Sequence, residues 1–542
     1  MGPRLPFRPR RHQALWPIPA WLTAACLLAA APVLGHDQQH PSAPEAAFIS
    51  DVASASEHGW QTYLAPPADG FVDTVGVVTH HHYSNTSYGE HDLLKMLDRL
   101  NIRHIRDAIT PQSMEFYADF VEQAGPGAGV SYVLNDGEDI PWEDQIRMVA
   151  GQAPATASQI ESDNEPDCDG WQDGEIEGYH ELARDMRELM DSLPELREVP
   201  LATPSFCRTT EEHYSAYGDD GVSDRFNIHP YVAGLLPEEE IGRTLEWVRN
   251  AAPGAVPVVT EGGFHNAVKT KSGHLPTSER AEGAYLPQMF LEYQRRGIAL
   301  THSYELINIR DDPSETKREE HFGLYRFDGS LKPAGASLAA LLATMTDSRG
   351  AGAEPQTVRL AAEGGGDKLR VQPYIRSDGS IDVVLWMAQR IWDRDERRDL
   401  PNKISQITVS VPEISGGSYV RIDGTEKPER IRMGDASRFT VPVNAHPTVL
   451  RLDPGASGHV QPDSGDRLCD SERPDGGACV RDRRSNAEPS AVSSSTRPQS
   501  GNGGSARGGV ARLREGTQGS VGPAPTADRP ECLPEDHDVE CD

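Results

Sequence analysis

Short apolar runs alternate with amphipathic segments between about residue 71 and residue 347. Runs of about four to eight residues that are rich in β-branched side chains and bounded by turn formers predict strands. Eight segments fit this pattern: residues 72–79, 102–108, 130–135, 156–162, 199–203, 225–229, 256–260 and 299–305. Together they predict a sheet whose strands are separated by long connections.

The connections carry apolar residues at helical spacing, as Leu93, Leu97 and Leu100 show in segment 92–100. The same periodicity predicts helices at residues 179–193, 238–251 and 279–296. Eight strand–helix units within residues 71–347 predict an α/β fold, a (β/α)8 TIM barrel.

A different pattern follows the barrel. Short alternating strands separated by Gly, Pro and Asn are predicted at residues 369–374, 381–387, 404–411, 419–423, 438–441 and 448–452. The pairs Asp378-Gly379 and Asp423-Gly424 suit tight hairpin turns. We therefore expect a small β-sandwich domain over residues 355–455.

The two ends of the chain have biased compositions. Four arginines within residues 1–11 precede an apolar run from residue 20 to residue 34, which predicts a signal peptide over residues 1–35 and a secreted or periplasmic protein. This run is too short to span a membrane. We expect a linker at residues 36–70. From residue 456 to residue 542, Ser, Gly, Pro and charged residues predict a disordered tail.

The net charge indicates which classes of partner are disfavoured, and the number of cysteines indicates the redox compartment. The chain of 542 residues has 83 acidic and 52 basic side chains, a net charge of -31, which disfavours nucleic acid. We expect a monomer. Removing the signal peptide leaves six cysteines, an even number that suits an oxidising compartment. Cys168 and Cys207 fall near neighbouring strand ends and could form a disulfide. Cys469 with Cys479 and Cys532 with Cys541 could pair locally, although sequence does not fix connectivity.

Two glutamates stand at the ends of predicted barrel strands, where the reactive groups of such barrels lie. Glu165 follows the fourth strand in Asn164-Glu165-Pro166, and Glu261 ends the seventh in Val-Val-Thr-Glu-Gly-Gly. An apolar strand end is a costly place for a carboxylate unless it is paired or functional. Strands four and seven face each other across the barrel, so the two carboxylates can converge on one bond, as glycoside hydrolysis requires.

These motifs resemble those of clan A glycoside hydrolases, the barrel enzymes that include families 5 and 39. The resemblance implies that Glu165 is the acid/base, that Glu261 is the nucleophile, and that Asn164 binds the sugar 2-hydroxyl. It covers about residues 71–347, and the predicted sandwich is similar to one appended to several families of the clan. In those families it mainly packs against the barrel.

The resemblance also implies roles for neighbouring side chains. Arg106, at the end of the second strand, looks like the arginine that hydrogen-bonds the nucleophile. His229 and Tyr231 resemble the aromatic pair beside it. Many members carry a Trp at the end of strand eight as a sugar platform, whereas this sequence has Tyr304 followed by Glu305. Tyr304 is expected to bind substrate, and this departure leaves the identity of the sugar at the cleavage point open.

A second hypothesis starts from the first strand, where His80 and His82 point to one face. With His229 and Asp311 or Asp312 they form part of a zinc set like that of metal-dependent amidohydrolases. The fifth strand lacks a histidine, however, and the fourth ends in Glu where those enzymes use a modified lysine. We favour hydrogen bonding to substrate for His80.

A third hypothesis is a non-catalytic polysaccharide-binding protein. The main expectation is an exported retaining glycoside hydrolase acting on a poly- or oligosaccharide, a mechanism that needs no metal or organic cofactor. Aromatic side chains in the loops could stack on sugar rings: Trp142, Trp171, Tyr217, Tyr231 and His265. The glycan, and the choice between internal and terminal cleavage, are not encoded in a recognisable motif.

Overall fold

A computed structural model describes the protein at residues 59–135, 140–168, 170–172, 174–347, 354–412, 414–434 and 436–454. The expected signal peptide, the expected tail and the cysteine pairs within that tail lie outside the described residues.

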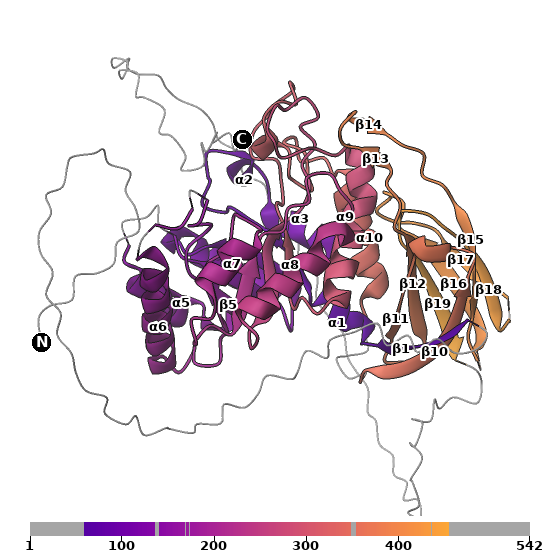
Figure 1. Cartoon of the computed structure of the whole chain (residues 1–542), viewed down its shortest axis with the longest axis horizontal. Helices are drawn as coiled ribbons and strands as arrows, with labels where there is room; N and C mark the ends of the chain where they lie inside the picture. The colour runs from indigo at the N-terminus through magenta and orange to yellow at the C-terminus, as the bar shows by residue number, and fades with distance from the viewer. Residues whose placement is uncertain are drawn as a thin grey trace, which may run out of the picture. The chain divides into compact units, whose positions relative to one another are not determined.

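Eight parallel strands close into a barrel in chain order (Figure 1). They are β2 (Val75–Val78), β3 (His104–Ala108), β4 (Gly129–Val133), β5 (Ala157–Glu161), β6 (Leu201–Ala202), β7 (Arg225–Ile228), β8 (Val256–Gly262) and β9 (Thr301–Ser303). Each lies within or overlaps one of the eight predicted segments, so the barrel prediction is confirmed. Strands of a parallel barrel are covered on both faces, which explains why β2 and β4 are buried at every position.

Helices cover the outside of the barrel. The longer ones are α3 (Leu93–Leu100), α4 (Met114–Ala124), α5 (Trp142–Gln152), α6 (Glu175–Ser192), α7 (Glu211–Tyr217), α8 (Glu238–Ala251), α9 (Glu279–Arg295) and α10 (Pro333–Met345). Short turns of helix are α1 (Ala68–Val72), α2 (Ser87–Glu90), η1 (Pro111–Ser113), η2 (Pro154–Thr156), η3 (Arg318–Glu320) and η4 (Gly366–Lys368). The predicted helices are present as α3, α6, α8 and α9.

Local signals set the helix ends. Asp92 accepts a hydrogen bond from the Lys95 amide and caps the start of α3. The helix ends at Asn101, whose left-handed backbone (φ 60°) is a common helix stop. Leu97 and Leu100 face inward and are fully buried, so the apolar stripe that predicted this helix is also what attaches it to the barrel.

The second domain is a sandwich of two antiparallel sheets. One has the order β1–β10–β15–β18 and the other β11–β12–β19–β16–β17, and a separate hairpin is formed by β13 and β14. Their bounds are β1 (Trp60–Ala65), β10 (Gln356–Glu363), β11 (Leu369–Ile375), β12 (Ile381–Met387), β13 (Trp392–Asp393), β14 (Arg398–Asp399), β15 (Ser405–Ser410), β16 (Ile414–Arg421), β17 (Arg430–Met433), β18 (Arg438–Val443) and β19 (Thr448–Pro454). The sandwich prediction is confirmed.

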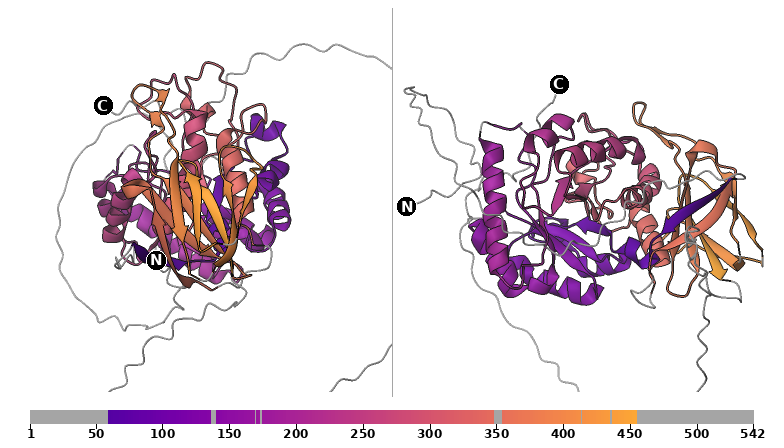
Figure 2. Two further views of the ribbon diagram at one scale, coloured as in Figure 1. Left: turned by 90° about the vertical axis from the view of Figure 1, so that its right-hand side faces the viewer. Right: turned by 60° about the horizontal axis from the view of Figure 1, so that its bottom comes forward.

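One prediction is wrong in this region. Residues 36–70 were expected to be a linker, but Trp60–Ala65 forms β1 and pairs antiparallel with β10, from Trp60 opposite Ala361 to Ala65 opposite Gln356. Figure 2 shows this N-terminal strand, in indigo, among the orange strands of the sandwich. Within the described residues, the chain therefore passes first through the sandwich and then through the barrel.

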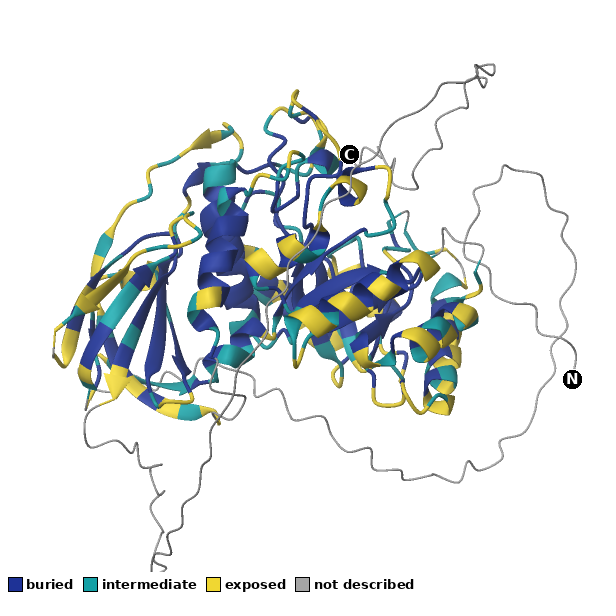
Figure 3. Ribbon diagram, turned by 180° about the vertical axis from the view of Figure 1, so that it is seen from behind, coloured by how far each residue is buried: buried dark blue, intermediate teal, exposed yellow. Residues whose placement is uncertain are grey.

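Helices α9 and α10 are buried along most of their length, as the dark blue helices of Figure 3 show. They pack against each other, and α9 contacts the sandwich, where the Gln288 side-chain amide donates to the Ala445 carbonyl at 2.6 Å. Arg376 and Arg451 of the sandwich donate hydrogen bonds to the Thr346 and Thr344 carbonyls at the end of α10, at 2.7 and 2.9 Å. Cationic side chains suit the negative end of a helix dipole, so these contacts join the two domains.

Candidate active site

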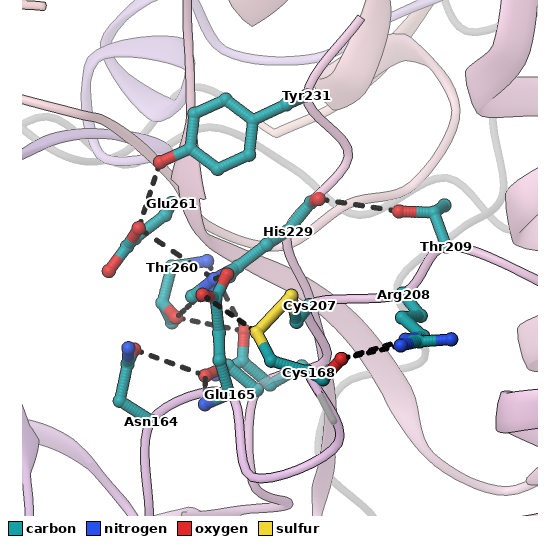
Figure 4. Close-up of polar contacts among 12 residues, drawn as sticks. Asn164, Glu165, Cys168, Cys207, Arg208, Thr209, His229, Tyr231, Thr260 and Glu261 are labelled. Carbon is teal, nitrogen blue, oxygen red and sulfur yellow. Dashed lines mark hydrogen bonds and ion pairs between the residues drawn. A yellow bond between two sulfur atoms is a disulfide. The ribbon is translucent and has the colours of Figure 1, made fainter. Parts of the chain in front are cut away.

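The two strand-end glutamates converge at the mouth of the barrel (Figure 4). A carboxylate oxygen of Glu165, one of Glu261 and a ring nitrogen of His229 lie within 4.8 Å of one another. The Glu165 side chain is 25% exposed and the Glu261 side chain is 10% exposed. Both carboxylates are therefore partly accessible, while the barrel fixes what surrounds them.

Arg106 holds Glu261 from inside the barrel. Its Nη1 donates to Glu261 Oε1 at 2.5 Å, its Nη2 to Asn164 Oδ1 at 2.8 Å, and its Nε to Glu161 Oε1 at 2.7 Å. Burial opposes the charge on the guanidinium, but the charges of Glu161 and Glu261 outweigh it and raise the pKa of Arg106 above its ordinary value. Arg106 is thus a permanent cation shared between two carboxylates.

Glu161 belongs to this network and was missed by the sequence analysis. It is fully buried and accepts hydrogen bonds from Arg106, from Asn227 Nδ2 at 2.6 Å and from Thr260 Oγ1 at 3.0 Å. The sequence did contain a signal for Glu161. Gln159 and Glu161 are two residues apart on one strand, so both side chains point to the same face, into the barrel. Glu161 neutralises the side of Arg106 that faces away from Glu261.

His229 contacts both glutamates, and Tyr231 contacts Glu261, as Figure 4 shows. His229 Nδ1 is 2.6 Å from Glu165 Oε1, and its Nε2 is 3.0 Å from Thr260 Oγ1. The Tyr231 hydroxyl donates to Glu261 Oε2 at 2.8 Å. Burial, with the nearby carboxylates, raises the pKa of Tyr231 well above its ordinary value, so this hydroxyl stays a donor.

The contact between His229 Nδ1 and Glu165 Oε1, at 2.6 Å, holds one hydrogen. Burial lowers the pKa of His229 to about 4, so its ring is neutral and carries one N–H. The Thr260 hydroxyl has one hydrogen, which it can give to Glu161, to Asn227 at 2.9 Å or to His229 Nε2, so either ring nitrogen can carry the N–H. The hydrogen of the short contact then belongs to His229 Nδ1 or to Glu165 Oε1.

Hydrogen bonds to Ser205 fix the loop that carries Glu165. Glu165 has a left-handed backbone (φ 47°), which is costly for a side-chain-bearing residue. Its amide donates to Ser205 Oγ at 3.0 Å, and Ser205 Oγ donates in turn to Asn164 Oδ1 at 3.2 Å. Ser205 lies beyond the fifth predicted strand and was not singled out from the sequence, because a serine in a loop gives no distinctive pattern.

A disulfide between Cys168 and Cys207 closes the same loop, as expected from their places near neighbouring strand ends. Asp167 accepts from the Cys207 amide at 2.8 Å, and the Arg208 guanidinium donates to the Cys168 carbonyl at 2.7 Å. Cys168 Sγ lies 3.7 Å from Glu165 Oε2. The disulfide therefore forms part of the immediate surroundings of the Glu165 carboxylate.

Replacing both cysteines, as Cys168→Ser with Cys207→Ser, is expected to lower the free energy of unfolding by about 3 kcal/mol, because the bridge closes a loop of 39 residues. Denaturant unfolding measures this loss. An unchanged unfolding midpoint in the double variant, with the disulfide verified in the parent protein, would refute this expectation.

His80 and Tyr304 lie at the mouth beside these groups. The His80 ring stacks on Tyr83 with centroids 4.8 Å apart, and its Nε2 is 3.6 Å from Glu305 Oε2. Glu305 is fully buried and accepts from the Tyr88 hydroxyl at 2.9 Å. Tyr304 is mostly buried, so it presents little face to a sugar. Burial lowers the pKa of His80 to about 3, which makes it a neutral polar group.

The zinc set of the second hypothesis is not gathered. His82 pairs with Asp107 at 3.5 Å, and Asp312 accepts the amides of Thr316 and Lys317 at 2.8 Å in its own loop. Within the described ranges, neither three-ligand group that could hold a metal includes His80 or His82.

One of those groups is the active-site set itself, formed by Glu165, His229 and Glu261. The Arg106 cation already occupies Glu261, which opposes a second cation there. The other group is Glu165 with the two cysteines of the disulfide. Sulfurs bonded to each other are poor metal ligands, because a thiolate is what binds a metal.

Two of the aromatic side chains expected to meet sugar rings are instead buried anchors. Tyr217 is 2% exposed and packs on Phe206, and His265 is 1% exposed and packs on Phe322. Tyr231 is partly exposed and lies over Glu261, where it remains available to a substrate.

Buried histidines make the stability of the fold depend on pH. Burial is the main cause that lowers the pKa from the ordinary 6.5 to about 4 at these positions: His104, His229, His265 and His446. Between about pH 6.5 and pH 4 the unfolded chain binds these protons and the folded protein does not, so stability falls as pH falls. Glu282, whose pKa burial raises to about 8, acts in the opposite direction.

We therefore expect the thermal midpoint to drop steadily when the pH is lowered from 7 to 4.5, since the histidines whose pKa burial lowers outnumber the carboxyl groups whose pKa burial raises. Differential scanning calorimetry at constant ionic strength measures it. A midpoint that stays level or rises over this window would contradict the assignment of neutral, buried rings.

The fold and the site together define a (β/α)8 barrel protein with two glutamates converging at the C-terminal ends of its strands. No helix in the described part of the chain is long and apolar enough to cross a membrane.

Among solved structures, the chain is similar to a family 39 glycoside hydrolase from Bacteroides cellulosilyticus, with 15% identity and a TM-score of 0.47 over 73% of this chain and 89% of that one. It is also similar to a family 51 arabinofuranosidase from Xanthomonas axonopodis pv. citri, with 12% identity and a TM-score of 0.49 over 73% of this chain and 99% of that one. A third similar structure is a family 30 endoxylanase from Clostridium papyrosolvens, with 10% identity and a TM-score of 0.42 over 70% of this chain and 96% of that one. No family model and no curated protein matches the chain. Identities and TM-scores this low transfer no residue roles, so the function has to be inferred from the site.

Proposed function

We propose that the protein is an exported glycoside hydrolase that cleaves O-glycosidic bonds of a poly- or oligosaccharide with retention of configuration. The observation that carries this proposal is the approach of the Glu165 and Glu261 carboxylates to within 4.8 Å. Retaining enzymes separate their two carboxyl groups by about 5 Å, whereas inverting enzymes leave roughly 6.5–9.5 Å for a water molecule. The disulfide at Cys168 and Cys207 is compatible with export.

In the first step Glu261 attacks the anomeric carbon, and the bond from that carbon to the leaving oxygen breaks. Glu165 gives its proton to the leaving oxygen, and we assign to Glu165 the hydrogen of its 2.6 Å contact with His229 Nδ1 in the resting state. Arg106 and Tyr231 hold one oxygen each of the Glu261 carboxylate, so the nucleophile enters the reaction in a fixed orientation.

In the second step the glycosyl ester on Glu261 is hydrolysed. Glu165, now a carboxylate, takes a proton from water, whose oxygen attacks the anomeric carbon from the face that the leaving group vacated. Two inversions give net retention. Neutral His229 then accepts a hydrogen bond from the reprotonated Glu165, which restores the starting state.

The experiment that tests the proposal combines a panel of plant and bacterial polysaccharides with a set of aryl glycosides. We expect release of reducing ends from at least one polymer, and proton NMR of the first turnovers should show the product anomer with the configuration of the substrate. Activity should be unchanged in a chelator. Inverted product, or activity lost in chelator and restored by zinc, would refute the mechanism; binding of a glycan without any turnover would establish the non-catalytic hypothesis.

A further inference from the structure

A hairpin of the sandwich contacts the loop that follows β8, residues 263–278. Arg397, at the turn of the hairpin, donates from Nη1 to the carbonyl oxygens of Val268 and Thr270 at 2.8 and 2.6 Å. Trp392 is buried and donates its indole N–H to the Pro276 carbonyl at 2.7 Å. Three backbone carbonyls of one loop are thus bound by side chains from the other domain.

The base of the hairpin is attached to the start of α9. Arg280 donates to the carbonyls of Ile391 and Leu400, at 3.1 and 2.6 Å, on the two sides of the hairpin. Asp399 accepts from Ser278 Oγ at 2.6 Å and pairs with Arg280 at 3.1 Å. These contacts fix the base of the hairpin to the start of α9. Figure 1 labels β13 and β14 beside the upper end of α9.

The supported loop reaches the catalytic pair through two aromatic contacts. His274 of the loop lies edge-on to Tyr231 with centroids 5.4 Å apart and stacks on Phe322 at 5.8 Å. Tyr231 is the side chain that donates to Glu261. The path from the hairpin to the carboxylate therefore runs through the loop, His274 and Tyr231, and each member of it is packed or hydrogen-bonded.

The same loop forms one wall of a cavity of about 590 Å³ at the end of the barrel. Asn266, Val268 and Ser278 line it on this side, and Asn308 and His321 line it on the side of the next loop. Two of these wall residues, Val268 and Ser278, are the ones the hairpin binds. Movement of the hairpin would change the shape of this cavity.

We infer that the β13–β14 hairpin is a positioning element of the active site: it holds the loop at residues 263–278 so that Tyr231 stays on Glu261 and the cavity keeps its shape. The inference rests on the proposed function for its catalytic consequence. It gives the sandwich a role in catalysis beyond packing on the barrel. A displacement of about 1 Å at a reacting group costs roughly 10²-fold in rate, so a loosened loop should be visible in kinetics.

The test compares Arg397→Ala with Arg398→Ala. Arg398 is the matched control, because it is the adjacent arginine of the same hairpin, is exposed, and, among the residues that the structure describes, forms its ion pair within the hairpin, with Asp393 at 3.2 Å. We expect Arg397→Ala to lower kcat at least ten-fold and to raise KM, with partial recovery in Arg397→Lys, which can still donate to a carbonyl. Arg398→Ala should match the wild type in both constants.

Hydrogen exchange of the loop amides supplies a readout that needs no substrate. Peptides covering residues 263–278 should exchange faster in Arg397→Ala and as in the wild type in Arg398→Ala, with the rest of the barrel unchanged in both. Wild-type exchange or wild-type kinetics in Arg397→Ala would overturn the inference. Faster exchange in a protein that hydrolyses no glycoside at all would refute the proposed function while supporting the hold on the loop.

Discussion

Glu261→Gln is expected to reduce kcat by roughly 10⁴-fold or more, the largest effect of any single substitution in this protein. In the proposed mechanism Glu261 is the nucleophile, and an amide of the same size cannot form the glycosyl ester. The fold should survive, because Gln keeps an acceptor for Arg106 and its amide can donate to the Tyr231 oxygen. Steady-state turnover and a thermal melt, measured on the same preparation, separate the two effects.

Glu165→Gln provides the companion measurement, since the two glutamates should differ in how they depend on the leaving group. An aryl glycoside with an acidic phenol needs little protonation, so the first step should persist in Glu165→Gln while the second becomes slow and a burst of phenol appears. Glu261→Gln should give no burst on the same substrate. Losses of only a few-fold in both variants, or a burst in Glu261→Gln alone, would contradict the assigned roles.

The barrel and its glutamate pair were accessible from sequence because both depend on local patterns. β-Branched runs mark the strands, and a carboxylate at the end of an apolar strand is conspicuous, which is how Glu165 and Glu261 were found. Eight strand–helix units were expected, but helices α4, α5 and α7 were given no residue ranges from the sequence. Their apolar stripes are short and broken by polar residues, so the barrel rather than the local sequence stabilises them.

Long-range partners explain the rest of what was missed. Strand β1 pairs with a segment nearly three hundred residues further along the chain, and a single strand without its partner looks like a linker. Arg397 also contacts residues that are distant in the sequence, because its hydrogen bonds go to backbone carbonyls of the loop at residues 263–278. Every residue has a carbonyl, so a contact of this kind leaves no mark on the sequence of the loop that it holds.

Arg106→Met is expected to cost about 3–5 kcal/mol of unfolding free energy, the largest loss of stability among the substitutions considered. The guanidinium is the one cation bound to both Glu161 and Glu261, and Glu161 is fully buried. Removing it leaves a carboxylate in the barrel interior without a counter-charge. Arg106→Lys should be less damaging to stability, but an ammonium group cannot reach both carboxylates and Asn164 as the guanidinium fork does.

A double variant separates the effect of Arg106 on stability from its effect on catalysis. In Arg106→Met combined with Glu161→Gln, the fully buried position 161 no longer carries an unpaired charge, so much of the stability should return while kcat stays low, because Glu261 is no longer held. Arg99→Ala is the control: its ion pair with Glu426 is largely exposed, at 45% and 29%, and should be worth less than about 1 kcal/mol. If urea unfolding put Arg106→Met within the range of that control, the network around Glu161 could not be what holds this end of the barrel together.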